Sequence, residues 1–137
     1  MFDAQHFAEG AAAFAVAFLT AAVFLVAFKL LYQAVTPHRE RDLIRAGNPA
    51  AAITLGGAML GYVIPLATAL TQTASLPEFA AWAALAGLIQ IVVFLLVRQF
   101  RFRDLSDRIE RGEIAPALYL STVSIAVGLI NAASMTA

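Results

Sequence analysis

Residues 48–65 read NPAAAITLGGAMLGYVIP and contain no charged side chain. This segment belongs to a charge-free stretch at residues 49–70, and three similar stretches occupy residues 11–28, 79–97 and 114–133. As helices, with a rise of about 1.5 Å per residue, they would span about 27–33 Å, which matches a hydrocarbon core of about 30 Å. A backbone that crosses lipid must satisfy its own hydrogen bonds. The sequence therefore predicts an all-α integral membrane protein with four transmembrane helices.

The composition of the chain agrees with a membrane protein. Of its 137 residues, 61% are apolar and 13% are charged, whereas soluble domains have about 45–50% and about 25%. Nine basic residues balance nine acidic ones, which argues against nucleic acid as a partner. There is no cysteine, so disulfides and thiolate chemistry are excluded. We expect a single membrane domain over residues 1–137.

The basic residues indicate an orientation in the membrane. They all lie between the first and second stretches or between the third and fourth: Lys29, Arg39, Arg41 and Arg45, then Arg98, Arg101, Arg103, Arg108 and Arg111. Loops rich in Lys and Arg remain in the cytoplasm. Both loops are therefore expected to be cytoplasmic, with both termini in the periplasm.

The two halves of the chain follow the same plan of apolar helix, basic loop and apolar helix. A shift of 65 residues aligns the run DLIRAG at 42–47 with DRIERG at 107–112. This pattern predicts two parallel helix-loop-helix repeats, at about residues 7–72 and 77–137, related by a pseudo-twofold axis along the membrane normal.

Each loop carries signals of a short helix. Thr36 precedes Pro37, which is typical of a helix start, and Gly47 is typical of a helix end. One interpretation is a short amphipathic helix at the membrane surface in each loop. The alternative is that the first and third membrane helices continue into the cytoplasm.

Small residues indicate where helices pack closely. In lipid, helix contact depends on residues that let backbones approach. Gly57 and Gly61 form a GxxxG pattern, and Ala52 and Gly56 continue the spacing of small residues. Pro65 should kink the same helix, because proline removes a backbone hydrogen bond. Gly128, in the fourth span, is the further packing candidate.

Two amide side chains lie inside the spans. Gln90 and Asn131 are costly in hydrocarbon unless they have partners, so they should face protein or water. One interpretation is hydrogen bonding between helices. The other is a polar lining for a transported solute.

The sequence contains no set of residues typical of catalysis, a metal or another cofactor. Asp3, His6 and Glu9 have helical spacing, but solvation at a terminus explains them better than a metal site. The hydroxyl residues of the spans have no basic partner nearby in the sequence that would activate them. We therefore expect a protein that is not an enzyme.

An anion site is a further hypothesis for the cytoplasmic loops. Arg45 and Arg111 precede the starts of two membrane helices, at Asn48 and Glu113. Free N–H groups and the positive end of the helix dipole favour a lipid phosphate there. General attraction between the arginines and anionic lipid is the alternative. The candidate residues for an anion or lipid headgroup are Arg45, Asn48 and Arg111.

The order of these motifs resembles that of the YjfL-like family of small bacterial inner-membrane proteins, known as domain of unknown function 350. The resemblance is carried by Thr36-Pro37, Leu43-Ile44, Gly47-Asn48, Ala50-Ala51-Ala52, Gly56-Gly57, Gly61, Pro65-Leu66 and the run GLINAA at 128–133. The family often repeats Gly-Asn in the second half, where this chain has Gly112-Glu113. The resemblance implies the bacterial inner membrane and no catalytic residues. It also implies genomic company with membrane-stress coat proteins, ATP-grasp synthetases and polyamine-synthase-like enzymes, and hence a role in membrane stress.

Two functional hypotheses follow. In the first, the protein is a non-catalytic homo-oligomer whose basic loops contact anionic lipid or a soluble cytoplasmic protein. In the second, it is a small transporter or channel subunit with a polar path between the two repeats, lined by Gln90, Asn131 and the Ser and Thr side chains of the spans.

Overall fold

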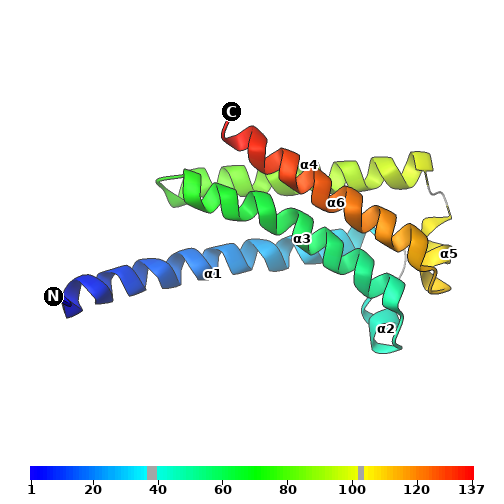
Figure 1. Ribbon diagram of the computed structural model, residues 1–137, viewed down its shortest axis with the longest axis horizontal. Coiled ribbons are helices and arrows are strands. Elements are labelled where there is room, and N and C mark those ends of the chain that lie inside the picture. The colour runs from blue at the N-terminus through cyan, green and yellow to red at the C-terminus, as the bar shows by residue number, and fades with distance from the viewer. Residues whose placement is uncertain (37–39, 102–103) are drawn as a thin grey trace.

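The computed structural model describes residues 1–36, 40–101 and 104–137. In this part of the chain the secondary structure is entirely helical (Figure 1). The helices in chain order are α1 (Ala4–Val35), α2 (Glu40–Arg45), α3 (Pro49–Gln72), α4 (Leu76–Arg101), α5 (Leu105–Glu110) and α6 (Ile114–Met135).

Four helices are long and apolar enough to cross a membrane, which confirms the predicted fold class. They are α1, α3, α6 and residues 76–98 of α4, with 32, 24, 22 and 23 residues. At about 1.5 Å per residue, α1 is about 48 Å long and exceeds a bilayer core of about 30 Å. This helix must therefore tilt or project from the hydrocarbon region.

The two interpretations of the loops are both partly correct. The first and third membrane helices continue past their apolar stretches, to Val35 and Arg101, and a separate short helix follows each of them. The two-repeat architecture itself stays a prediction.

We predicted that Thr36 starts the short helix of the first loop, and the described part of that helix, α2, begins at Glu40. Thr36 instead ends α1, where its hydroxyl donates a hydrogen bond of 2.6 Å to the Tyr32 carbonyl. A threonine hydroxyl can bond either to free N–H groups at a helix start or to a carbonyl one turn back. The expected role of Pro37 lies outside the described residues.

Glycine ends both short helices in the same way. Gly47 and Gly112 have φ values of 85° and 78°, in the left-handed region that favours glycine. The amide of Gly47 donates to Ile44 and that of Asn48 to Leu43, which is a Schellman motif. The corresponding bonds run from Gly112 to Ile109 and from Glu113 to Arg108.

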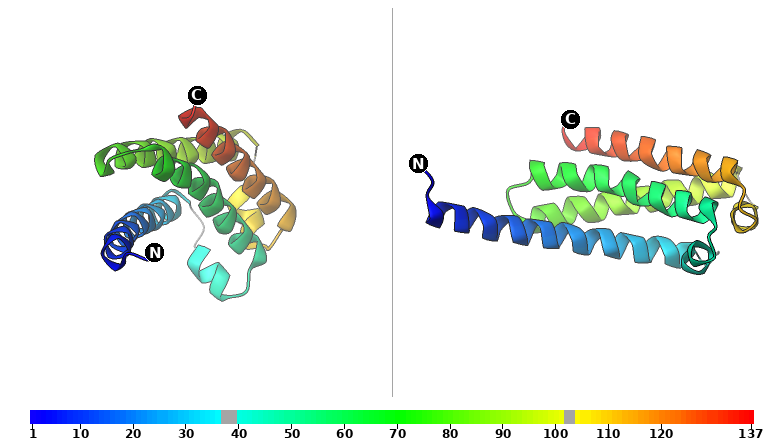
Figure 2. Two further views of the ribbon diagram at one scale, coloured as in Figure 1. Left: turned by 60° about the vertical axis from the view of Figure 1, so that its left-hand side comes forward. Right: turned by 60° about the horizontal axis from the view of Figure 1, so that its bottom comes forward.

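The long helices share one packed core, but they contribute to it unequally. The closest partners are α3 and α6, and α4 packs against both of them. From α1 only Phe28 and Tyr32 are buried, and its N-terminal end extends beyond the other helices (Figures 1 and 2). Both termini and the α3–α4 connection lie at one end of the molecule, and α2 and α5 lie at the other (Figure 2).

Candidate functional site

The closest contact between helices joins α3 to α6 through glycine. A Cβ atom added at Gly61 would overlap the backbone of Ser124, and one added at Gly128 would overlap the backbone of Gly61. A Cβ atom at Gly57 would overlap Ser121. Three of the predicted packing residues, Gly57, Gly61 and Gly128, therefore meet at one contact, which requires residues without side chains.

The other two predicted packing residues lie differently. An added Cβ atom at Gly56 would meet nothing within 4 Å, so this glycine has no part in the α3–α6 contact. Gly56 and Gly57 face different directions because neighbouring positions of an α-helix lie about 100° apart. Pro65 is buried in the core, and α3 continues past it to Gln72. The expected kink stays a prediction.

The two intramembrane amides form a reciprocal pair of hydrogen bonds between α4 and α6. Gln90 Nε2 donates to the Ser124 carbonyl at 3.0 Å, and Asn131 Nδ2 donates to the Ala86 carbonyl at 3.2 Å. Each helix thus supplies one amide donor and one backbone acceptor. We call this arrangement the amide clasp. Gln90 Oε1 is buried and has no hydrogen-bond partner among the described residues.

Several hydroxyl groups of the spans bond within their own helices. Thr54 donates to the Ala50 carbonyl and Thr122 to the Leu118 carbonyl, both at 2.8 Å. Such bonds satisfy a hydroxyl group in an apolar environment without a partner from another helix. These hydroxyl groups and the amide nitrogens of the clasp are therefore hydrogen-bonded within the protein, whereas a solute path would need polar groups that can bind the solute.

Asn48, a candidate for the anion site, makes three side-chain hydrogen bonds within the protein, and the anion site itself stays a prediction. Its Oδ1 accepts from the Ala51 amide at 3.1 Å and caps α3. Its Nδ2 donates to the carbonyls of Ile109 and Glu110, at 2.8 and 3.2 Å. The side chain therefore ties the start of α3 to the end of α5, and its polar atoms are occupied.

Arg111 is also engaged, at the start of α6. Glu113 accepts from Arg111 at 2.9 Å and forms a salt bridge of 3.2 Å with Arg108. The hydrogen bond from Arg111, and then the interaction with Arg108, lower the pKa of the Glu113 carboxyl from its ordinary value, although partial desolvation opposes the change. Glu113 thus compensates the charges of Arg108 and Arg111. The third anion candidate, Arg45, lies on α2 beside the end of α1.

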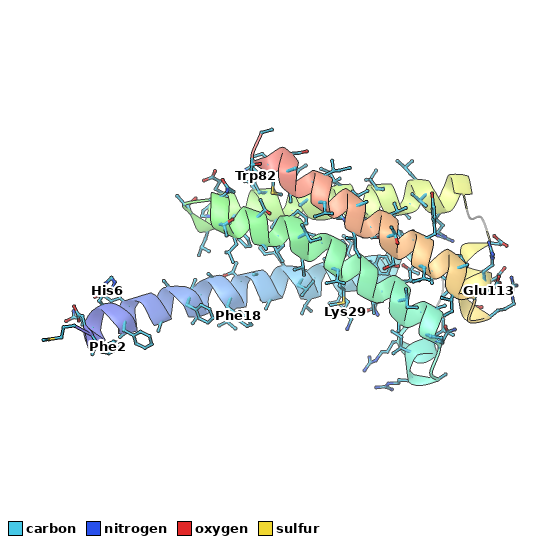
Figure 3. The ribbon with its side chains drawn as sticks, viewed as in Figure 1. Phe2, His6, Phe18, Lys29, Trp82 and Glu113 are labelled. Carbon is cyan, nitrogen blue, oxygen red and sulfur yellow. The ribbon has the colours of Figure 1, made fainter. Side chains whose placement is uncertain are left out.

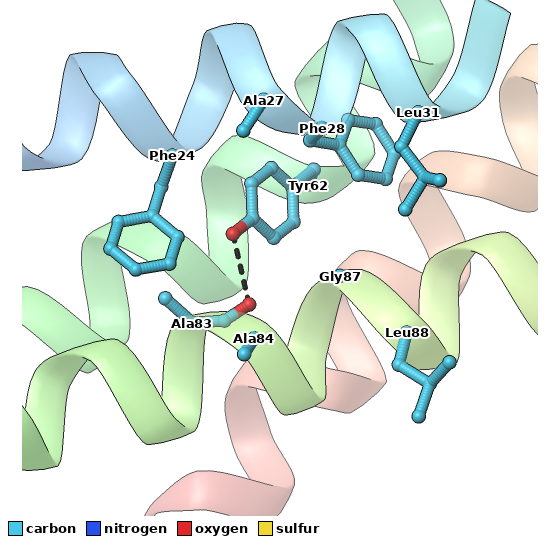
Figure 4. Close-up of a pocket in the computed structure, with 9 residues that line it drawn as sticks. All are labelled: Phe24, Ala27, Phe28, Leu31, Tyr62, Ala83, Ala84, Gly87 and Leu88. Carbon is cyan, nitrogen blue, oxygen red and sulfur yellow. Dashed lines mark hydrogen bonds between the residues drawn. The ribbon is translucent and has the colours of Figure 1, made fainter. Parts of the chain in front are cut away.

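A pocket that we did not predict lies between α1, α3 and α4 (Figure 4). It has a volume of about 310 Å³ and apolar walls that include Phe24, Phe28 and Tyr62. The rings of Phe28 and Tyr62 stack with centroids 4.4 Å apart, and the Tyr62 hydroxyl donates to the Ala83 carbonyl at 2.9 Å (Figure 4). The spacing of Phe24 and Phe28 places both rings on one face of α1, a signal that the sequence does contain.

One of the N-terminal residues considered for a metal site, Asp3, has a structural role. Asp3 caps α1, and its carboxylate accepts from the amides of Gln5 and His6 at 3.0 and 3.2 Å. Within the described part of the chain, no group of three or more His, Asp or Glu side chains is placed to hold a metal ion.

These features define a small all-helical membrane protein with glycine-mediated packing and a charged end. The chain belongs to the family described as Domain of Unknown Function (DUF350), whose model matches residues 6–135. It is similar to the UPF0719 inner membrane protein YjfL of Escherichia coli strain K12 and to that of strain O157:H7. Identity to each is 36% over 132 residues, which cover 96% of this chain and 99% of the relative. No solved structure matches the chain.

Proposed function

We propose that this protein is a non-catalytic, oligomeric scaffold of the bacterial inner membrane whose basic cytoplasmic end binds anionic phospholipid. The proposed location rests on the four apolar helices and on the likeness to the inner membrane protein YjfL. The proposed cytoplasmic placement of α2 and α5 rests on the arginines of both loops.

The amide clasp is the observation that favours a packed scaffold over a transporter. Gln90 is 5% exposed and Asn131 is 7% exposed, and each donates to a backbone carbonyl of the other helix. Hydrogen bonds between helices in lipid contribute about 0.6–2 kcal/mol each. The amides therefore stabilise the bundle, as expected of a packed scaffold.

Charge at one end of the molecule supports lipid binding. Arg41 and Arg45 on α2 are exposed, and Arg111 lies at the end of α5. A basic residue near an anionic membrane surface contributes about 1 kcal/mol, and salt weakens this attraction over a Debye length of about 10 Å at 0.1 M.

The small number of buried residues in α1 supports the proposal that the protein forms oligomers. Ala11 and Ala15 lie one turn apart on this helix, and both are exposed. Small residues at this spacing favour close contact between membrane helices. In this proposal the corresponding surface of a second copy covers them.

Lipid binding is tested with the protein reconstituted in vesicles of phosphatidylethanolamine with and without phosphatidylglycerol. We expect the protein to enrich phosphatidylglycerol around itself, and we expect the enrichment to fall when salt is added. Replacement of Arg45 and Arg111 together by Gln should reduce it without loss of helix content. Equal retention of both lipids at low salt would contradict the proposal.

A flux measurement on the same vesicles distinguishes the transporter hypothesis from the scaffold. A scaffold should leave the permeability to small ions and neutral solutes at the level of protein-free vesicles. Flux that the wild type supports and that Gln90→Leu abolishes would establish a path at the amide clasp and contradict the scaffold.

A further inference from the structure

A groove of about 450 Å³ lies between the end of α1, helix α2 and the start of α3. Lys29 and Gln33 line it from α1, one turn apart, and Arg41 and Arg45 line it from α2, also one turn apart. The spacing of four residues places each pair on one helix face. Figure 3 shows Lys29 toward the end of the molecule at which α2 lies. We call this feature the cationic groove.

Among the described residues, the cationic groove has no acidic partner like the one found in the second loop. No carboxylate is among the described residues that line the groove. In the second loop, Glu113 forms salt bridges with both Arg108 and Arg111. The residue at the equivalent position of the first loop is Asn48, which is neutral and bonded to α5. Three cations therefore share a small space, which favours an anion between them.

The shape of the groove indicates what kind of anion it would take. Arginine binds phosphate through paired N–H groups, and lysine binds it as a point charge. Lys29 is half-buried toward the end of a membrane helix, a position from which a lysine ammonium can extend to the headgroup layer. Leu30 and Ile44 are exposed and add apolar surface to the same groove. Cations beside apolar side chains match a phosphate that carries acyl chains.

We infer that the cationic groove is a binding site for one anionic glycerophospholipid of the inner leaflet, with its phosphate held by Lys29, Arg41 and Arg45. The acyl chains would lie along Leu30 and Ile44. This inference rests on the proposed function and deepens it, because it replaces general attraction at the basic end with one site of defined stoichiometry.

The test is native mass spectrometry of the full-length protein in mild detergent, titrated with phosphatidylglycerol. We expect one tightly retained lipid on the wild type. Lys29→Gln and Arg45→Gln should each weaken its retention about fivefold, and together about 25-fold, as expected from the loss of one or two surface charges. Lys29→Arg should restore retention. The matched control is Arg98→Gln, which removes one cation near the end of α4 and should change retention less than twofold.

Two further measurements identify the ligand and separate this inference from the proposed function. Phosphatidylethanolamine should be retained more weakly than phosphatidylglycerol, and inorganic phosphate should not displace the lipid more than chloride does at equal ionic strength. Displacement by phosphate alone would overturn the lipid assignment. Equal losses for Lys29→Gln, Arg45→Gln and Arg98→Gln would overturn the groove but keep lipid binding by the basic end. No loss in any variant, together with no effect of salt, would overturn both.

Discussion

Gly61 and Gly128 bring two helix backbones together at positions where any side chain would collide. An added Cβ at Gly61 meets the Ser124 backbone, which cannot rotate away as the tip of a side chain can. At Gly56, one position around the helix from Gly57, the same added atom meets open space. Adjacent glycines of one motif therefore differ in what they do, although both lie in the same helix.

This difference predicts opposite results for two alanine substitutions. Gly61→Ala should lower the free energy of unfolding by about 1–3 kcal/mol, because overpacking displaces a backbone. Gly56→Ala should be neutral or stabilising by up to about 1 kcal/mol, since alanine favours helix more than glycine does. Thermal unfolding in detergent, followed by the fluorescence of Trp82, measures both. Equal stabilities would contradict the glycine contact.

Asn48 acts both as a cap and as a link, and aspartate separates the two roles. Asn48→Asp keeps an oxygen to cap α3 but removes the donor to the Ile109 and Glu110 carbonyls. We expect a loss of about 1–3 kcal/mol, because a carboxylate would face two carbonyl oxygens. Hydrogen exchange should accelerate in α5 and remain slow at the start of α3. Acceleration at both places would indicate that capping, and not the link, was lost.

At the scale of elements, the short helices α2 and α5 end in the same glycine turn but are held by different interactions. The last carbonyls of α5 accept hydrogen bonds from Asn48. At the same end of α5, Arg108 and Arg111 donate hydrogen bonds to the Glu113 carboxylate. Ile109 is fully buried, whereas Ile44 at the equivalent position of α2 is exposed. Helix α5 is therefore docked on the bundle, and α2 leaves a groove beside α1.

The Glu113 salt bridges predict that the α5–α6 junction depends on pH. The pKa of Glu113 is lowered in the folded state, so the ionised carboxylate stabilises the folded state at neutral pH. This stabilisation is lost as the pH falls through the lowered pKa, which lies below the usual carboxylate value of about 4. Protection of α5 amides from hydrogen exchange should therefore decrease in acid. Glu113→Gln should show the reduced protection already at neutral pH. A wild type and a Glu113→Gln variant with the same pH profile would exclude this residue as the cause.

At the scale of the whole molecule, the two ends differ in charge and the long helices differ in burial. The connection of α3 to α4 lies with both termini at one end, and the arginine-bearing short helices lie at the other (Figure 2). Helix α1 extends furthest and contributes little to the core. Such a molecule can anchor by its apolar helices and present one basic end to the membrane surface.

The proposed orientation predicts which sites a membrane-impermeant thiol reagent reaches. The chain has no native cysteine, and Ala46 and Ala74 are exposed in connections at opposite ends. In spheroplasts, Ala74→Cys should react from outside, and Ala46→Cys should react only after the membrane is opened. Ala137→Cys is the control at the C-terminus and should behave like Ala74→Cys. Reaction of Ala46→Cys in sealed spheroplasts would reverse the topology.

The sequence by itself determined the features that depend on neighbours along the chain. Four charge-free stretches define the membrane helices, because a backbone in lipid can satisfy its hydrogen bonds within each helix. The turn at Gly47 was predicted for a similar reason, since a glycine with positive φ ends a helix through bonds to the preceding turn. Thr36 shows the limit of such local signals, because a hydroxyl suits a helix start and a helix end alike.

Only the tertiary structure decided how distant residues pair. The sequence marked Gly61, Gln90 and Asn131 as residues in need of partners, but it did not identify the helix that supplies them. Arg45, expected to act with Asn48 and Arg111, lies instead in a groove with Lys29. The physical reason is that the packing angle and rotation of each helix place these side chains together, and both depend on the complete set of contacts in the bundle.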